Sequence, residues 1–217
     1  MLAELIGLRP KLRAFDEKYR YLSRVLPAHG LADYEKLRKY FQELYTEFER
    51  VPPSSALEIG TSDLMKLALA TSFDGNGKAL TLDESVEANL KRLSRKPILR
   101  NISVERTDFR DVDTGESKYD VLIFENIMDL IAYDEKTNHN AIYDKIIRAV
   151  KPSGILVVSS NLYYRENGSE LLSKGEGVYT TVQDELAKRS DVRFRRKIDG
   201  SCLLPIQHAI TYVFERV

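Results

Sequence analysis

The sequence predicts an α/β protein built on a mostly parallel sheet of seven strands, with an antiparallel last strand and a helical hairpin at its N-terminus. Short apolar runs without polar alternation are separated by helical stretches over residues 55–160. This order is typical of parallel strands that are covered by helices on both faces. Near the C-terminus two further strand-like runs follow each other with no helix between them. We expect these two strands to pair antiparallel at the end of the parallel sheet.

The first fifty residues are expected to form the hairpin. Two stripes of apolar residues recur there at intervals of three and four, the spacing of one helix face. Residues 27–30, Pro-Ala-His-Gly, separate the stripes with turn-forming chemistry, and Asp33 can cap the second helix. The chain is therefore divided into a hairpin, 1–50, and a sheet domain, 51–217, and the hairpin is interpreted as packing on the sheet, as a lid or as a homodimerisation arm. The stripes are Leu12, Phe15, Tyr19, Leu22 and Leu26, followed by Tyr34, Leu37, Phe41, Leu44 and Phe48.

The elements of the sheet domain follow from the same patterns. Proline and serine over 52–55 end the hairpin. Residues 151–154, Lys-Pro-Ser-Gly, lead into the fifth strand, and proline at the second position with glycine at the fourth fits a type I turn. Strands are expected at 56–59, 79–82, 102–104, 121–124, 155–159, 192–198 and about 208–216, and helices at 63–71, 85–93, 140–150 and about 178–190.

Length and charge limit the classes of function. The 217 residues fit one domain with an appendage, and 43% hydrophobic residues suffice for a core. Lys and Arg together number 33, as do Asp and Glu, so the net charge is zero. General affinity for nucleic acid or an anionic membrane usually needs a basic excess, so neither partner is expected. Arg193, Arg195 and Lys197 are expected on one face of a charged edge strand, with RNA binding as the lesser alternative.

Cysteine and histidine usage excludes further kinds of site. Cys202 is the only cysteine, which excludes an intramolecular disulfide and any metal centre built from several cysteines. The histidines, His29, His139 and His208, do not stand at metal-motif spacing. No signal peptide or membrane span is recognised, so a cytoplasmic protein is expected.

Ligands of open α/β sheets bind beyond the carboxyl ends of the strands, which makes the residues after each predicted strand the candidate site. After the first strand, Gly60 permits a tight turn and close approach of a ligand to the backbone. Thr61 and Ser62 follow at the start of a helix, whose free N–H groups can hold a carboxylate or phosphate. A capped helix start explains these residues equally well.

The next three strands are each followed by polar residues. Asp83 follows the second strand, where a carboxylate can accept hydrogen bonds from both hydroxyls of a ribose, or can cap the next helix. After the third strand, Asp108 could accept from an exocyclic amine and Phe109 could pack on a flat base. Glu125 and Asn126 follow the fourth strand.

The order of these features resembles the class I S-adenosylmethionine-dependent methyltransferases, which have a Rossmann-like sheet whose seventh strand is antiparallel. The resemblance covers residues 55–160 by sequence and the tail by topology only. It rests on Leu-Glu-Ile-Gly-Thr at 57–61, Leu-Thr-Leu-Asp at 80–83, Asp-Phe at 108–109, Tyr-Asp-Val-Leu-Ile-Phe at 119–124 and Arg-Ala-Val-Lys-Pro-Ser-Gly-Ile-Leu-Val-Val at 148–158.

The resemblance implies S-adenosylmethionine as the cofactor and a small-molecule acceptor that is methylated at oxygen or nitrogen. It implies that Asp83 holds the ribose and that Asp108 and Phe109 hold the adenine. Glu125 and Asn126 would lie beside the methyl group. The methionine part of the cofactor would lie against Glu58, Gly60, Thr61 and Ser62.

Two positions depart from the family pattern. Its glycine loop usually has glycines two and four residues beyond Gly60, where this chain has Ser62 and Leu64. The bulk of Leu64 suggests a reshaped loop or lost cofactor binding, so a non-catalytic scaffold with the same fold is the first alternative.

A narrower similarity links residues 58–61 and 74–83 to the catechol and caffeoyl-CoA type O-methyltransferases. Those enzymes hold a divalent metal partly through an Asp-Asn pair, which corresponds here to Ser160-Asn161. A hard cation prefers several anionic oxygen ligands, so no metal is expected.

Methyl transfer requires orientation of the acceptor and, where the acceptor must lose a proton, a base. The catalytic candidates are His139, in a polar loop after the fourth strand, and Tyr163, after the fifth. A solvent-exposed histidine at a helix start and a packed tyrosine are the plain interpretations of the same residues. An RNA methyltransferase and a nicotinamide-dependent oxidoreductase are further alternatives, and the missing Gly-x-Gly-x-x-Gly counts against the latter.

Overall fold

The computed structural model describes residues 13, 15–17, 19–22, 34–51, 55–61, 64–71, 75–125, 139–163, 186–199 and 207–217, with the backbone alone at 34, 139, 160–163 and 207–210. Residues 13, 15–17 and 19–22 are helical. The elements that follow are α2 (Tyr34–Phe48), β1 (Ser55–Ile59), α3 (Met65–Ala70), β2 (Asn76–Thr81), α4 (Glu84–Ser94), a 3-10 turn (Pro97–Leu99), β3 (Ile102–Arg106), β4 (Tyr119–Glu125), α6 (His139–Ala149), β5 (Val150–Tyr163), β6 (Val192–Asp199) and β7 (Gln207–Arg216).

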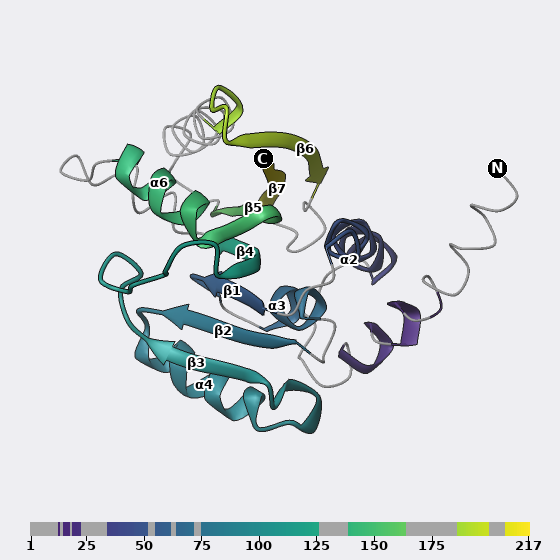
Figure 1. Ribbon diagram of the computed structural model, residues 1–217. Helices are drawn as coiled ribbons and strands as arrows, with labels where there is room; N and C mark the ends of the chain where they lie inside the picture. The colour runs from purple at the N-terminus through teal and green to yellow at the C-terminus, as the bar shows by residue number, and fades with distance from the viewer. Residues whose placement is uncertain are drawn as a thin grey trace, which may run out of the picture.

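The predicted sheet is confirmed. Seven strands lie in the order β3-β2-β1-β4-β5-β7-β6 (Figure 1). The first five are parallel to one another, whereas β7 runs antiparallel to both β5 and β6. The closing antiparallel pair is therefore present, with the last strand inserted between β5 and β6.

Helices cover both faces of the sheet, which explains why the central strands show no polar alternation. Figure 1 shows α2 and α3 on one side and α6 on the other. Every residue of β4 is buried. Its alternate side chains enter two separate core clusters: Val121 and Ile123 pack on the α2–α3 face, Leu122 and Phe124 on the α6 face.

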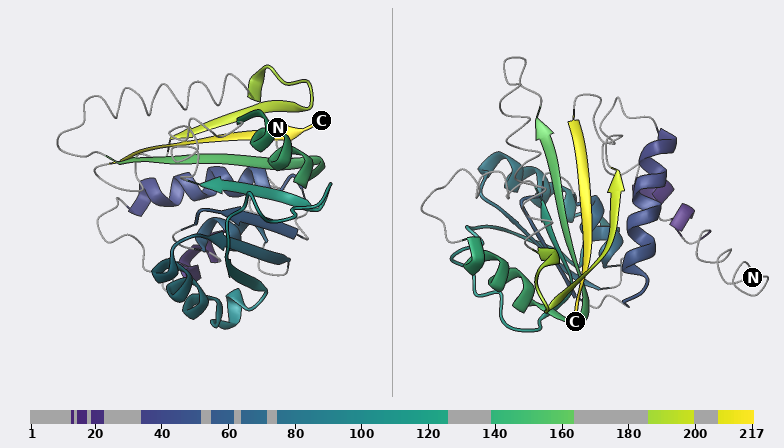
Figure 2. Two further views of the ribbon diagram at one scale, coloured as in Figure 1. Left: turned by 90° about the vertical axis from the view of Figure 1, so that its left-hand side faces the viewer. Right: turned by 90° about the horizontal axis from the view of Figure 1, so that it is seen from above.

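The apolar stripes of the hairpin pack into the α2–α3 face. Phe15, Tyr19 and Leu22 of the first stripe are buried there together with residues of α2 and of the sheet. Figure 2 shows α2 lying alongside the closing strands at one end of the sheet. The predicted second helix agrees with α2, whereas most of the helix expected at about 178–190 lies outside the described residues.

Three local predictions need correction. The strand expected at 79–82 is β2, which begins at Asn76 and ends at Thr81. The helix expected at 63–71 is the shorter α3, which begins at Met65, and Leu64 at its N-cap position makes no side-chain capping bond. The turn at 151–154 is part of β5, and Ser153 has a φ of 63°. A positive φ at the third position fits a type II turn rather than the expected type I.

A bulge at Arg195 breaks the expected alternation of β6. Phe194 lies opposite Phe214 while Arg196 lies opposite Val213, so one extra residue is inserted and the faces exchange beyond it. Val192 consequently packs on the α6 face and Ile198 on the α2–α3 face. The prediction that Arg193, Arg195 and Lys197 share one face is therefore wrong.

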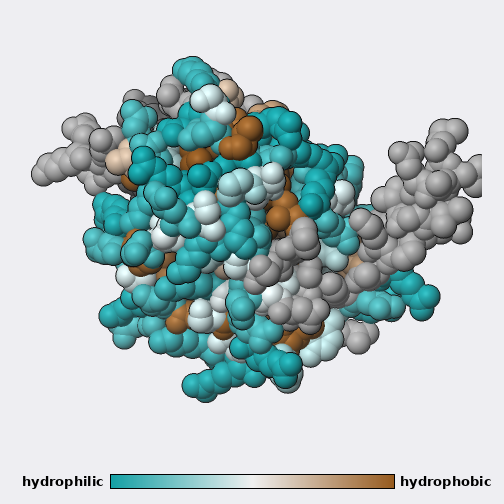
Figure 3. Space-filling model, viewed as in Figure 1, coloured by the Kyte–Doolittle hydropathy of each residue, from teal (hydrophilic) through white to brown (hydrophobic). Residues whose placement is uncertain are grey.

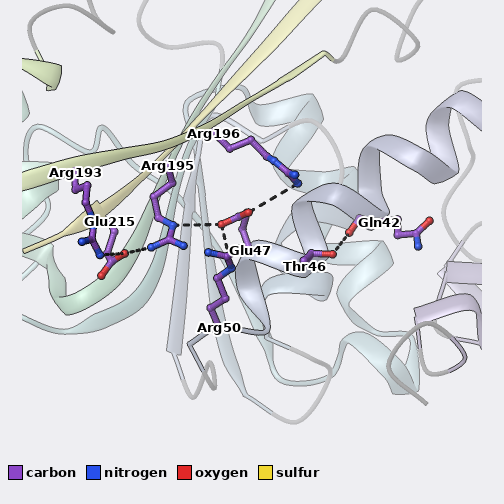
Figure 4. A network of polar contacts seen from close by, with 8 residues as sticks. All are labelled: Gln42, Thr46, Glu47, Arg50, Arg193, Arg195, Arg196 and Glu215. Carbon is purple, nitrogen blue, oxygen red and sulfur yellow. Dashed lines mark hydrogen bonds and ion pairs between the residues drawn. The ribbon is translucent and has the colours of Figure 1, made fainter. Parts of the chain in front are cut away.

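The bulge directs two arginines toward α2. The carboxylate of Glu47, which is 2% exposed, lies 3.5 Å from Nε of Arg195 and 3.9 Å from Nη1 of Arg196 (Figure 4). Arg50 of the same helix end lies 3.5 Å from this carboxylate, and Arg195 also pairs with Glu215 of β7. This ion-pair network, rather than a solvated basic stripe, joins the C-terminal end of α2 to the edge of the sheet.

The surface gives no sign of a large apolar face on the side shown in Figure 3, where hydrophobic residues are scattered among hydrophilic ones. Among the helices that the structure describes, none is long and apolar enough to cross a membrane.

Candidate functional site at the carboxyl ends of the strands

The sheet has one topological switch point, between β1 and β4. From β1 the chain proceeds outward through β2 to β3, then returns to β4 on the other side of β1 and continues to β5. Ligands of open α/β sheets bind outside the carboxyl ends of the strands at such a point. The residues after β1, β2, β3 and β4 therefore lie along the edge where a ligand is expected.

Gly60 ends β1 in a conformation that glycine adopts easily. Its φ is 84°, and its N–H still donates to the carbonyl of Leu80 at 2.9 Å, which continues the ladder with β2. Thr61 beside it is buried. Leu64, in place of the usual last glycine, is fully buried in the α2–α3 core cluster, so its side chain packs inward.

Asp83 caps α4, as the alternative interpretation proposed. Its Oδ1 accepts from the backbone N–H groups of Ser85 at 2.7 Å and Val86 at 3.1 Å, and from the Ser85 hydroxyl at 2.7 Å. The Ser85 hydroxyl bond and the two N–H bonds lower the pKa of Asp83. Because these three bonds all end on Oδ1, capping the helix and accepting from a ribose hydroxyl through Oδ2 are compatible.

Asp108 and Phe109 are engaged within the protein. The Arg110 guanidinium donates hydrogen bonds to both carboxylate oxygens of Asp108, and this contact lowers the pKa of Asp108. Phe109 is 4% exposed and packs edge-on against Phe124, with ring centroids 5.2 Å apart. In this conformation Phe109 is a core residue of the α6 face rather than an open stacking surface.

Glu58 and Glu125 lie on the two strands that flank the switch point. Both are buried. Glu125 forms a buried ion pair with Lys66 of α3, and the Lys66 ammonium also donates to the Ser159 hydroxyl of β5 at 3.3 Å. Burial alone would lower the pKa of Lys66, but the charge and hydrogen bond of Glu125 outweigh it, and Glu58 and Tyr40 add to the rise, so the pKa is raised.

Two residues from distant segments complete this group. The ring of Tyr40, on α2, lies with its centroid 6.0 Å from the Lys66 ammonium. Its hydroxyl shares a 2.8 Å hydrogen bond with that of Thr211 on β7. We call the six residues Tyr40, Glu58, Lys66, Glu125, Ser159 and Thr211 the switch-point cluster.

Sequence reasoning found only the two glutamates of this cluster. Lys66 carried a usable signal, because it is the only charged residue in the apolar run 64–70 and so has no polar helix face to occupy. Tyr40, Ser159 and Thr211 have no comparable signal, since tyrosine, serine and threonine are common in helices and strands.

The catalytic candidates lie at the ends of two elements. His139 is the first residue of α6 and Tyr163 the last of β5. Ser62 and Asn126 lie outside the described residues. Within the part of the chain that the structure describes, no group of three or more His, Cys, Asp or Glu residues is arranged to hold a metal ion.

Comparison of the sequence with known proteins gives no match, neither to a protein-family model nor to a curated protein. Comparison of the structure gives many. The N-methyltransferase NodS from Bradyrhizobium japonicum WM9 is 15% identical, with a TM-score of 0.57 over 82% of this chain and 97% of that one. A SAM-dependent methyltransferase from Aquifex aeolicus is 15% identical, with a TM-score of 0.57 over 81% and 89%.

A third similar structure is geranyl diphosphate methyltransferase in complex with GPP and sinefungin, 8% identical, with a TM-score of 0.56 over 82% of this chain and 77% of that one. Identities this low carry information about the fold alone. The strand order and the antiparallel β7 are those expected for the methyltransferase fold, and the similar structures are methyltransferases. The chain therefore has the fold of the class I S-adenosylmethionine-dependent methyltransferases.

Proposed function

We propose that the protein binds S-adenosylmethionine and transfers its methyl group to a small-molecule acceptor at oxygen or nitrogen. The observation that carries the proposal is the methyltransferase strand order, with polar residues following each strand around the switch point. Structural neighbours support it: NodS was crystallised with S-adenosyl-l-homocysteine, and geranyl diphosphate methyltransferase with SAM. Fold alone does not determine function, so the residues must also suit the cofactor.

The residues of this edge fit the cofactor in three respects. The positive φ of Gly60 allows the backbone to approach a ligand closely. Asp83 has one carboxylate oxygen beyond its capping bonds, suited to ribose hydroxyls. The switch-point cluster holds two carboxylates against one ammonium, an acidic excess that suits a sulfonium cation.

When bound, S-adenosylmethionine would supply a methyl group activated by the positive sulfur. The protein's task is then to hold the acceptor in line with that group. The acceptor's lone pair would form the new bond to carbon as the carbon–sulfur bond breaks, which would leave a neutral thioether. His139 or Tyr163, both at the same edge of the sheet, takes the acceptor's proton where one must leave. We place Ser62 and Thr61 with Gly60 against the methionine part, Asp108 near the adenine, and Asn126 with Glu125 near the methyl group, whereas Phe109 stays packed in the core against Phe124.

Binding of S-adenosylhomocysteine, measured by isothermal titration calorimetry on folded protein, tests the proposal. The informative variant is Asp83→Asn, because asparagine keeps an oxygen to cap α4 but replaces the second oxygen by a donor that cannot accept from ribose hydroxyls. We expect about tenfold weaker binding, since one bond to a charged group is lost. Glu116→Gln, an exposed acid near the opposite edge of the sheet, is the matched control and should leave binding unchanged.

If the folded parent protein binds neither S-adenosylmethionine nor S-adenosylhomocysteine, the non-catalytic scaffold is the correct interpretation. RNA methylation has less support, because Arg193, Arg195 and Arg196 are engaged with Glu47 and Glu215. A homodimer formed through residues 1–50 stays a prediction that light scattering of the full chain at several protein concentrations would test.

A further inference from the structure

The α2–α3 face of the sheet changes from apolar to polar at the carboxyl edge. Ile123, Val157 and Val213 of β4, β5 and β7 belong to the core cluster of this face. Two residues further toward the edge, the same three strands carry Glu125, Ser159 and Thr211, which lie opposite one another in direct register. Alternation along β1 places Glu58 on this face as well, two residues after buried Ala56.

Lys66 supplies the positive charge of the switch-point cluster. It belongs to α3, a helix whose six residues are all buried, and its own side chain is 5% exposed. Its ammonium reaches across to Glu125 and Ser159, so the charge lies between the helix layer and the sheet. A buried charge is costly unless it is paired, and here the ion pair with Glu125 and the hydrogen bond to Ser159 offset that cost.

The charged residues of the switch-point cluster lie beside the switch point itself. Glu58 lies on one strand beside it and Glu125 on the other, and both groups act electrostatically on Lys66. Two carboxylates and one ammonium give a formal charge of −1 in a region where all three side chains are buried. Interactions between charges are several-fold stronger there than in water, so one added or removed charge has a large effect on a charged ligand.

We propose that Lys66, through its ion pair with Glu125, sets the charge of the switch point and thereby the preference of the site for the cationic sulfonium donor over its neutral thioether product. The inference rests on the proposed function. Lys66 is in this view a positioning and selectivity residue that need not touch the ligand. Without the Lys66 ammonium, Glu125 would lose its cationic partner and the site would be more negative. The site would then favour the cationic donor over the neutral product more strongly.

The test measures the dissociation constants of S-adenosylmethionine and S-adenosylhomocysteine by calorimetry in the full chain. The preference for S-adenosylmethionine is the dissociation constant of S-adenosylhomocysteine divided by that of S-adenosylmethionine. This ratio cancels effects on the shape of the site that both ligands share. We expect Lys66→Met to raise the preference for S-adenosylmethionine about tenfold and Glu125→Gln to lower it about tenfold, on the scale of one charge at an effective dielectric constant near 20. The double variant, K66M/E125Q, restores the formal charge and should restore the parent ratio.

The control is Lys151→Met. Lys151 pairs with Asp120 at 2.8 Å, at the opposite edge of the same sheet. Removing this charge should lower stability and leave the ratio unchanged. If Lys66→Met does not fold, the comparison of Glu125→Gln with the double variant tests the inference. The double variant leaves neither charge of the pair buried without its partner.

A ratio that stays constant in all variants, with both affinities falling together, would overturn the inference while leaving the proposed function intact. A folded parent that binds neither ligand overturns both. A lowered preference for S-adenosylmethionine in Glu125→Gln that returns to the parent value in the double variant supports both, because a purely structural role of the pair would change both affinities alike and leave the ratio constant.

Discussion

The hydroxyl groups of Tyr40 and Thr211 lie 2.8 Å apart and share a buried hydrogen bond, although 171 positions separate the residues in the sequence. The bond joins α2, the second helix of the predicted hairpin, to the last strand, β7. Near the C-terminal end of α2, Glu47 joins the helix to the edge strand through Arg195. Because α2 is joined to the sheet at its middle and near its C-terminal end, and its apolar stripe lies in the core of the sheet, we expect it to unfold together with the sheet.

Tyr40→Phe tests the contribution of this hydrogen bond. The variant keeps the ring in the core and leaves the buried Thr211 hydroxyl without its partner from α2, which should lower the free energy of unfolding by about 1.5 kcal/mol. Urea unfolding followed by circular dichroism measures the change. Tyr21→Phe, at a residue that is 43% exposed, is the control and should change stability little. Equal effects of the two variants would show that the bond contributes nothing.

Arg195→Met tests the network that joins α2 to the edge strand. Glu47 is buried, and loss of Arg195 leaves it with Arg50 and Arg196 at 3.5 and 3.9 Å. We expect a loss of about 2 kcal/mol in urea unfolding, since interactions of a buried charged group are removed. Arg95→Met, at an exposed position after α4, should be close to neutral. A neutral Arg195→Met would mean that the other two arginines suffice.

Leu64→Ala tests whether the missing family glycine matters. Leu64 is fully buried, so truncation should lower the free energy of unfolding by about 3 kcal/mol. Affinity for S-adenosylhomocysteine should not improve, because the leucine side chain packs in the core. The matched control is Leu82→Ala, at a leucine that is 59% exposed, where the loss should be small. Tighter ligand binding by the Leu64 variant would show instead that the leucine obstructs the site.

Gly154→Ala tests the close packing at the start of β5. An added Cβ would lie 2.7 Å from Cγ1 of Val150 and 2.8 Å from the carbonyl oxygens of Asp120 and Lys151. Backbone atoms cannot yield as a flexible side chain can, so we expect a loss of about 3 kcal/mol in thermal or urea unfolding. Gly115→Ala is the comparison. Its φ of 68° brings strain, but the nearest atom is 3.5 Å away, so its loss should be nearer about 1 kcal/mol.

The pH dependence of stability should report Glu215. Hydrogen bonds from Arg193 and Arg195 outweigh burial and hold the pKa of Glu215 below its ordinary value of 4.5. A lowered folded pKa contributes stability that is present above the unfolded value and is lost as pH falls through the folded value. Glu215→Gln should therefore be less stable than the parent at pH 7, and the difference should shrink below about pH 4.5. A difference that is constant from pH 7 to about 3 would contradict this origin, and Glu116→Gln serves as an exposed control.

Much of the fold was readable because local patterns report burial. Strands such as β1 and β4 are buried on both faces, so their apolar runs stood out, and the predicted ranges fall within the observed strands to a residue or two. The helices at α4 and α6 agree in the same way. The bulge at Arg195 could not be predicted, because it depends on the pairing of β6 with β7 and not on the residues of β6 alone.

The residues of the candidate site likewise include some that the sequence reveals and some whose role arises only on folding. Asp83 was found because it follows a strand, a position that sequence order reveals, and Glu58 because residues 57–61 resemble the first loop of the methyltransferase family. The interior role of Phe109 was missed, because a residue that ends a strand near the edge can turn either toward a ligand or into the core, and its contact with Phe124 arises only on folding.

By itself the sequence determined the order of helices and strands, the two-faced burial of the sheet and the acids along its carboxyl edge, since these follow from apolar periodicity and chain order. Only the tertiary structure decided what those acids meet. Lys66 of α3 pairs with Glu125, and Ser159 of β5 and Tyr40 of α2 contact Lys66 in turn. Thr211 of β7 joins the cluster through its hydrogen bond with Tyr40. The physical reason is that a buried charge is compensated by the polar groups that the packing of distant segments brings within a few ångströms. The local spacing of residues in the sequence does not determine which groups those are.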